Sequence, residues 1–309
     1  MNKKVTIKDF SHLLGVHTET LATPCRDFFT DRNFNYSIIE GAELEQLILS
    51  ILKKINIDRQ VIGAKERDTV WENGWKENLN EFITSKYDLN KLTPKFIRPM
   101  QPIRFNGCYV RTENPNFELD YYSAYRLWIF TEYMSKFNTI YEFGCGTGFN
   151  LVELAKLYPE KRYHGLDFAN SSKRIIDLIA KKYLWNIDGH VFNLIHPDNS
   201  IEITPGSLVF TIGTIEQLAS KFEPFLQFLL AKKPELCLHI EPILELYDEN
   251  TLFDYLAIMF HKKRGYTQGF LPRLQELETQ GKIKILKIKR IYFGSLYMEG
   301  YTHIVWRPL

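Results

Sequence analysis

The chain has 309 residues, of which 45% are hydrophobic and 25% charged, which is typical of a globular protein and excludes a disordered one. Its formal net charge is +2 and its basic residues are dispersed, so nothing in the sequence indicates a nucleic-acid partner. The four cysteines are far apart without a CxxC pair, which argues against both a zinc site and a disulfide scaffold.

Residues 1–115 combine helical patterns with a proline-rich segment, and we expect a mostly helical extension. Apolar residues recur on one helical stripe at 44–55, and Trp71 and Trp75 begin a second stripe. We interpret these two tryptophans as core packing rather than ligand stacking. The prolines at 94–115 predict an irregular connection that can lie over a site.

Residues 116–309 form the second region, which opens with a helix predicted at 119–137 and then alternates apolar strands with helices. This alternation predicts a parallel sheet covered on both faces. The last two strands should form an antiparallel hairpin at one edge. Strands are predicted at 139–143, 162–167, 189–194, 207–212, 235–240, 282–293 and 301–306, and helices at 150–158, 171–185 and 215–233.

Gly144, Gly146 and Gly148 stand between the first of these strands and the helix that follows it. Glycine is needed where the backbone takes a positive φ or where a ligand must touch the main chain, and the helix N-terminus offers unpaired amides. We therefore expect a cofactor here. Dinucleotide folds place G-x-G-x-x-G at the same point, but Phe149 stands where that pattern has its third glycine.

Two acids narrow the choice of cofactor. Asp167 ends the second strand, where a carboxylate can accept the hydroxyls of a ribose. Glu142 precedes the glycine loop, and a carboxylate there favours a cofactor with a cationic end over a pyrophosphate, because two anions repel. The sulfonium and ammonium groups of S-adenosylmethionine meet this demand.

These residues resemble the first motif of the class I S-adenosylmethionine-dependent methyltransferases: an acid, an apolar residue and G-x-G-x-G, then an acid ending the second strand. The resemblance implies a Rossmann-like α/β fold over residues 116–309, with a seven-stranded, mainly parallel sheet whose last strand is antiparallel. It also implies that the glycine loop meets the methionine part of the cofactor. The cofactor residues expected are Glu142, Gly144, Cys145, Gly146, Gly148, Asn150, Asp167, Phe168, Asn193 and Gly213.

The chain departs from the family pattern after two strands. Asn193 stands near the place where an acid often meets the adenine amine, and an amide can also hydrogen-bond adenine. The fourth strand lacks the motif of enzymes that methylate base amines. For acceptor chemistry we expect Glu216 or Glu241, because sites of open α/β sheets lie at the carboxyl ends of the strands, or His261, which belongs to a polar cluster expected on a helix and the loop after it. We interpret His239 as structural.

The sequence thus predicts methyl transfer to oxygen or nitrogen of a small-molecule, saccharide or peptide acceptor, with residues 1–115 forming an acceptor pocket or lid. Two alternatives stay open: an S-adenosylmethionine-binding partner or sensor that does not methylate, and a nicotinamide-dependent reductase. We expect no metal and no nucleic-acid or membrane partner. A cytoplasmic location is expected, because the sequence has neither a signal-peptide pattern nor about 18 consecutive apolar residues.

Overall fold

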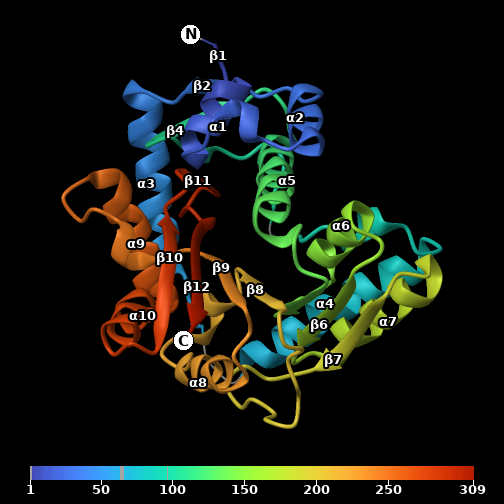
Figure 1. Ribbon diagram of the computed structural model, residues 1–309. Helices are drawn as coiled ribbons and strands as arrows, with labels where there is room; N and C mark the ends of the chain where they lie inside the picture. The colour runs from blue at the N-terminus through green and yellow to red at the C-terminus, as the bar shows by residue number, and fades with distance from the viewer. Residues whose placement is uncertain (1, 63–65, 96) are drawn as a thin grey trace.

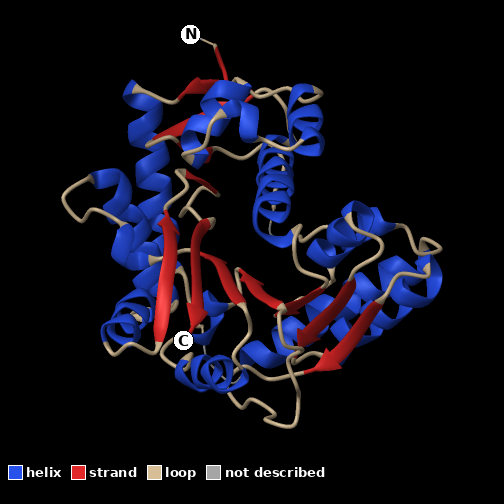
Figure 2. Cartoon of the chain, in the orientation of Figure 1, coloured by secondary structure: helices blue, strands red, loops and turns tan. Residues whose placement is uncertain are grey.

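The computed structural model describes residues 2–62, 66–95 and 97–309, which fold around two β-sheets (Figures 1 and 2). The large sheet has the strand order β10-β12-β9-β8-β5-β6-β7. Strands β5 to β9 are parallel, and β12 is antiparallel to both of its neighbours, which confirms the predicted sheet and edge hairpin. Its strands are β5 (Thr139–Phe143), β6 (Arg162–Asp167), β7 (Ile187–Val191), β8 (Leu208–Ile212), β9 (Leu236–Glu241), β10 (Ile283–Lys289) and β12 (Thr302–Pro308).

Helices cover both faces of the large sheet because the central strands are apolar on both sides. Within β5, Ile140 packs into a core with helices α5, α6 and α7, whereas Tyr141 packs into a second core with α8 and α10. These helices are α5 (Phe117–Ile129), α6 (Phe149–Leu157), α7 (Asn170–Tyr183), α8 (Glu223–Lys232) and α10 (Phe270–Thr279). Helix α5 continues into one π-helical turn, Phe130–Met134.

The small sheet was not predicted. It is antiparallel, with the order β1-β2-β4-β3-β11. Its strands are β1 (Lys3–Lys4), β2 (Asn35–Ile38), β3 (Ile103–Phe105), β4 (Cys108–Thr112) and β11 (Phe293–Gly294). Strands β3 and β4 form a hairpin around Asn106 and Gly107, whose φ values of 47° and 78° suit the Asn-Gly turn. The segment expected to be irregular therefore contains a hairpin whose turn signal is present in the sequence.

Three helices accompany the small sheet: α1 (Ile7–Leu14), α2 (Thr23–Thr30) and α3 (Gly41–Ile57). Helix α4 (Glu66–Thr84) lies away from this sheet and packs against α7 at the other end of the molecule (Figure 1). Helix α9 (Leu252–Arg264) packs against α3. Among the helices of the described residues, none is both long and apolar enough to cross a membrane.

Two predicted elements are interrupted. The helix expected at 215–233 is a short 3-10 turn, Ile215–Leu218, followed by α8, because Ala219 adopts a positive φ of 51° between them. The strand expected at 282–293 ends at Lys289, and Phe293 and Gly294 pair instead with β3 of the small sheet. In Figure 1 this short red strand lies beside the N-terminal strands.

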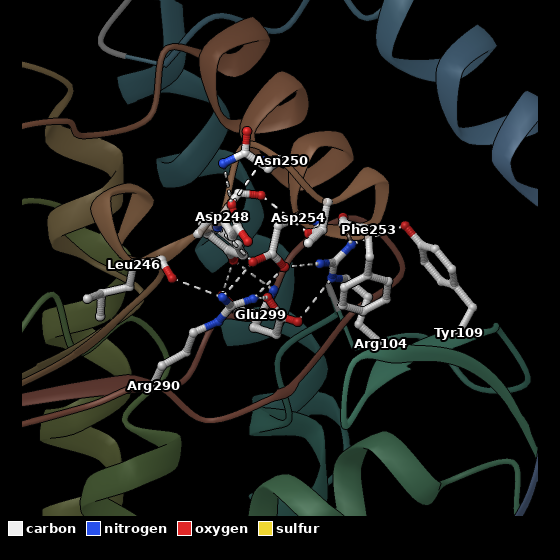
Figure 3. Close-up of polar contacts among 11 residues, drawn as sticks. Arg104, Tyr109, Leu246, Asp248, Asn250, Phe253, Asp254, Arg290 and Glu299 are labelled. Atoms are coloured by element: carbon white, nitrogen blue, oxygen red, sulfur yellow. Dashed lines mark hydrogen bonds and ion pairs between the residues drawn. The ribbon is translucent and has the colours of Figure 1, made fainter.

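Four charged side chains, of which Arg104, Asp254 and Glu299 are buried and Arg290 is half-buried, connect the small sheet to the C-terminal part (Figure 3). Arg290 binds Asp254 through two hydrogen bonds of 2.6 and 2.7 Å and Glu299 through one of 3.0 Å. Arg104 of β3 lies 3.3 Å from Glu299 and 3.4 Å from Asp254. Burial favours the neutral form of Asp254, but the hydrogen bonds from Arg290 and from the Asp248 N–H, together with the charges of Arg290 and Arg104, outweigh it, so the pKa of Asp254 is lowered. This charge cluster contains two charges of each sign.

Candidate cofactor and acceptor site

A cavity of about 400 Å³ lies at the carboxyl ends of β5, β6 and β8, a size usual for small-molecule sites. The sheet side of its wall contains five of the residues predicted to bind cofactor: Gly144, Asp167, Phe168, Asn193 and Gly213. The opposite side is formed by helix α4, and the 3-10 turn after β8 contributes Gln217 and Leu218. The cavity is therefore enclosed jointly by the large sheet and the N-terminal part of the chain.

The glycine loop has the backbone that its sequence predicts. Gly144, Gly146 and Gly148 have φ values of +73°, +52° and +74°, a region that L side chains rarely adopt. The space a side chain would need is filled by the protein itself, since a Cβ at Gly144 would overlap Thr214 and one at Gly148 would lie 2.5 Å from Ile176. The glycines thus allow the backbone to turn and also allow the loop to pack closely against Thr214 and Ile176.

Asp167 joins the tip of β6 to the glycine loop. Its Oδ2 accepts the backbone N–H of Gly146 at 2.9 Å, and its Oδ1 accepts that of Ala169 at 2.9 Å. Burial raises the pKa of Asp167 to about 6, although these two hydrogen bonds favour the charged form. A carboxylate has about four acceptor positions, so Asp167 keeps acceptor capacity beside the cavity it lines.

Glu142 lies on β5 immediately before the loop and is 1% exposed. Its Oε1 accepts a hydrogen bond of 2.6 Å from the Asn150 amide, whereas its Oε2 has no partner among the described residues. Burial raises the pKa of Glu142 to about 8, against the effects of Asn150 and Arg126. A buried carboxyl with one unpaired oxygen suits a neighbouring cation. Cys145 is also buried, which raises its pKa well above the ordinary value.

Glu241, one of the residues expected to carry acceptor chemistry, already uses both carboxylate oxygens within the protein. Oε1 accepts the Thr211 hydroxyl at 2.7 Å and the Thr214 N–H at 3.1 Å, and Oε2 accepts the Glu216 N–H at 3.3 Å. Burial raises the pKa of Glu241 to about 7, while these donors favour its charged form. Glu241 therefore holds the turn that carries Glu216.

His261 is linked to the same turn through Thr267. The buried His261 ring donates through Nε2 to the Thr267 carbonyl at 2.9 Å. Thr267 in turn donates its backbone N–H to the Glu216 carbonyl at 3.0 Å and its hydroxyl to the Ile215 carbonyl at 2.5 Å. Burial lowers the pKa of His261 to about 4, so the ring is neutral near pH 7.

Of the two acids expected to carry acceptor chemistry, Glu216 has fewer side-chain hydrogen bonds than Glu241. It is half-buried, and its Oε1 accepts a hydrogen bond of 2.7 Å from the neighbouring Gln217 side chain. Burial, and then the charge of Glu241, raise the pKa of Glu216 to about 8. His239 is fully buried, 2.9 Å from the Thr211 hydroxyl and packed against Phe270, which supports the structural role interpreted from the sequence.

The interpretation of Trp71 and Trp75 as core residues is wrong. Both side chains are half-buried and line the cavity, whereas Leu79 and Phe82, farther along the same stripe of α4, are in the core. The sequence shows the stripe but not what lies opposite each turn of the helix. Arg67, also on α4, lines the cavity and was not predicted either.

The order of the large sheet decides its fold class. From one edge it runs β7-β6-β5-β8-β9-β12-β10, with the last strand in sequence inserted antiparallel beside the fifth. The fold is that of the class I methyltransferases. This is the arrangement that the resemblance implied, and its glycine loop and acidic strand tip lie at the expected edge.

No protein-family model matches the chain, and no curated protein matches it in sequence. Among solved structures, an O-methyltransferase from neocarzinostatin biosynthesis, crystallised with S-adenosylmethionine and a naphthoic acid, is 12% identical; the match covers 62% of this chain and 58% of that chain, with a TM-score of 0.41. Human N-acetylserotonin methyltransferase with S-adenosylmethionine is 17% identical; the match covers 62% of this chain and 56% of that chain, with a TM-score of 0.39. An S-adenosylmethionine-dependent methyltransferase from Aquifex aeolicus is 17% identical; the match covers 55% of this chain and 82% of that chain, with a TM-score of 0.38. The chain thus spans little more than half the length of the first two proteins.

Proposed function

We propose that this protein is an S-adenosylmethionine-dependent methyltransferase acting on a small-molecule acceptor. The observation that carries the proposal is the cavity of about 400 Å³ with Asp167 in its wall, next to a glycine loop preceded by the buried Glu142. Two acids at this edge suit a cofactor with cationic groups and disfavour the pyrophosphate of a nicotinamide dinucleotide.

Three residues that line the cavity, and the buried Glu142 before the glycine loop, fit this cofactor group by group. Asp167 has acceptor capacity for ribose hydroxyls, and Phe168 offers an apolar surface beside it. Asn193 accepts the Ile195 N–H through Oδ1, which leaves its amide N–H groups as donors for an adenine nitrogen. The unpaired Oε2 of Glu142 is suited to the ammonium group. When bound, S-adenosylmethionine supplies an activated methyl group.

On the acceptor side we assign the chemistry to Glu216. Its pKa of about 8 suits a general base that takes the proton of an acceptor hydroxyl or amine near neutral pH. Glu241 and His261 act as positioning residues, because both fix the turn at 214–216 by hydrogen bonds. Helix α4 of the N-terminal part lines the cavity of about 400 Å³, and a cavity of this size favours a small acceptor.

Isothermal calorimetry tests the cofactor. We expect S-adenosylhomocysteine to bind and NADH not to bind. Glu142→Gln keeps a partner for Asn150 but cannot form the carboxylate that a bound ammonium group would favour, and should weaken binding about ten-fold. Asp177→Asn, on the exposed surface of α7, is the matched control and should leave affinity unchanged. Binding of NADH without binding of S-adenosylhomocysteine would overturn the proposal.

Transfer is tested with methyl-labelled S-adenosylmethionine and fractionated small-molecule extracts. We expect label in a small-molecule fraction and, with Glu216→Gln, a loss of about 100-fold or more in rate without loss of cofactor affinity. Cofactor binding without any labelled product, from extracts of small molecules, saccharides or peptides, would instead identify a non-catalytic binder.

A further inference from the structure

Helix α4 presents two stacked tryptophans to the cavity. Trp71 and Trp75 are one turn apart on the same face of the helix, with ring centroids 5.3 Å apart and planes inclined by 28°. Both are half-buried members of the cavity wall. The core beneath the helix is filled by Leu79 and Phe82, so packing between α4 and its neighbours does not require aromatic residues at 71 and 75.

One ring of the pair, that of Trp75, contacts the glycine loop directly. A Cβ at Gly146 would lie 2.9 Å from Cζ2 of Trp75, so this ring rests on the glycine backbone. Asp167, whose Oδ2 accepts the Gly146 N–H, lines the same cavity as both tryptophans. The aromatic rings thus lie opposite the strand tips where a nucleotide-like cofactor would bind.

Polar contacts hold α4 in this position. Glu72, between the tryptophans, accepts the backbone N–H of Ser171 at 3.2 Å and its hydroxyl at 2.5 Å, at the start of α7. Asn78 donates to the Lys91 carbonyl at 3.0 Å. On the sheet side, Thr147 of the glycine loop donates to the Leu92 carbonyl at 2.6 Å. The rings are therefore pre-positioned, which reduces the entropy lost on binding a ligand.

A flat, electron-rich wall of this kind binds flat aromatic groups and cations. We propose that Trp71 and Trp75 form an aromatic wall that packs against the adenosyl group of the bound cofactor, so that helix α4 completes the cofactor site. This inference rests on the proposed function, and it assigns half of the site to the N-terminal part of the chain.

The test measures binding of S-adenosylhomocysteine to single tryptophan variants by calorimetry and by tryptophan fluorescence. Stacking of a base on an aromatic side chain strengthens binding, so Trp71→Leu and Trp75→Leu should each weaken it about ten-fold or more. Trp71→Phe should retain most of the affinity because it keeps a ring. The control is Trp185→Leu, since Trp185 is equally half-buried but stacks on Tyr183 outside the cavity.

Fluorescence gives an independent readout. The cofactor product should quench the wild-type emission, and the quenching should be largely lost in Trp71→Leu and Trp75→Leu but kept in Trp185→Leu. Circular dichroism of each variant establishes that it is folded. If wild type binds and both leucine variants bind within about two-fold of it, the aromatic wall is refuted while the proposed function stands. If wild type does not bind, the proposed function itself fails.

Discussion

The charge cluster makes a quantitative prediction for Glu299→Gln. The carboxylate is 1% exposed and lies 3.0 Å from Arg290 and 3.3 Å from Arg104. Removing its charge leaves the buried Arg104 and the half-buried Arg290 with Asp254 as their only remaining acid in this cluster. Breaking a buried ion pair in this way costs about 3–5 kcal/mol. We expect the free energy of unfolding in urea to fall by that amount.

The matched control is Asp177→Asn. Its ion pair with Lys173, 2.6 Å long, joins two side chains one helical turn apart on the surface of α7. Such exposed pairs contribute about 0.3–0.5 kcal/mol. If Glu299→Gln and Asp177→Asn destabilised the protein to within about 1 kcal/mol of each other, the buried cluster would not have the energetic role assigned to it.

A double variant tests whether charge balance is the cause. Arg104→Met combined with Glu299→Leu removes one charge of each sign and leaves the bidentate pair of Arg290 and Asp254 intact. Replacing a buried ion pair by apolar residues is often close to neutral. We therefore expect the double variant to be more stable than Glu299→Gln alone, and the reverse order would exclude charge balance as the explanation.

Two further predictions concern the site. Gly144 and Gly206 have the same positive φ of +73°, but only a Cβ at Gly144 would overlap Thr214. In urea unfolding, Gly144→Ala should therefore lower the free energy of unfolding by about 1–3 kcal/mol more than Gly206→Ala, and equal losses would contradict the packing argument. The pKa of Glu216 in the folded protein, about 8, lies above its ordinary value, so the folded state binds the extra proton and loses stability as pH rises from about 5 to about 8. The melting temperature of Glu216→Gln should rise relative to that of wild type as the pH increases over this range. A difference that stays constant would refute the raised pKa of Glu216.

The hydrophobic periodicity of the sequence was sufficient to predict the large sheet. Its central strands are short apolar runs separated by amphipathic helices, and such runs have few alternatives once both faces are covered. The cavity residues at the strand tips followed for the same reason: carboxyl ends of parallel strands share one edge, so Gly144, Asp167 and Gly213 had to lie together.

Contacts between residues far apart in the chain could not be predicted from the sequence. Nothing local shows that Thr267 links His261 to the turn of Glu216, because that connection depends on how α9 packs. The tryptophan stripe of α4 was ambiguous for a related reason, since periodicity gives a face and not its neighbour. The hairpin at Asn106 and Gly107, by contrast, carried a readable signal that the surrounding prolines obscured.

The contribution of β11 to the small sheet bears on how the chain folds as it is synthesised. Phe293 is fully buried against Tyr121, with ring centroids 4.3 Å apart, and its strand covers the edge of β3. Until these late residues leave the ribosome, β3 has an open edge whose unpaired backbone groups can recruit another chain. The N-terminal part can therefore complete its sheet only after Gly294 has been synthesised, and a chain that ends before β11 should be more prone to aggregation than one that contains it.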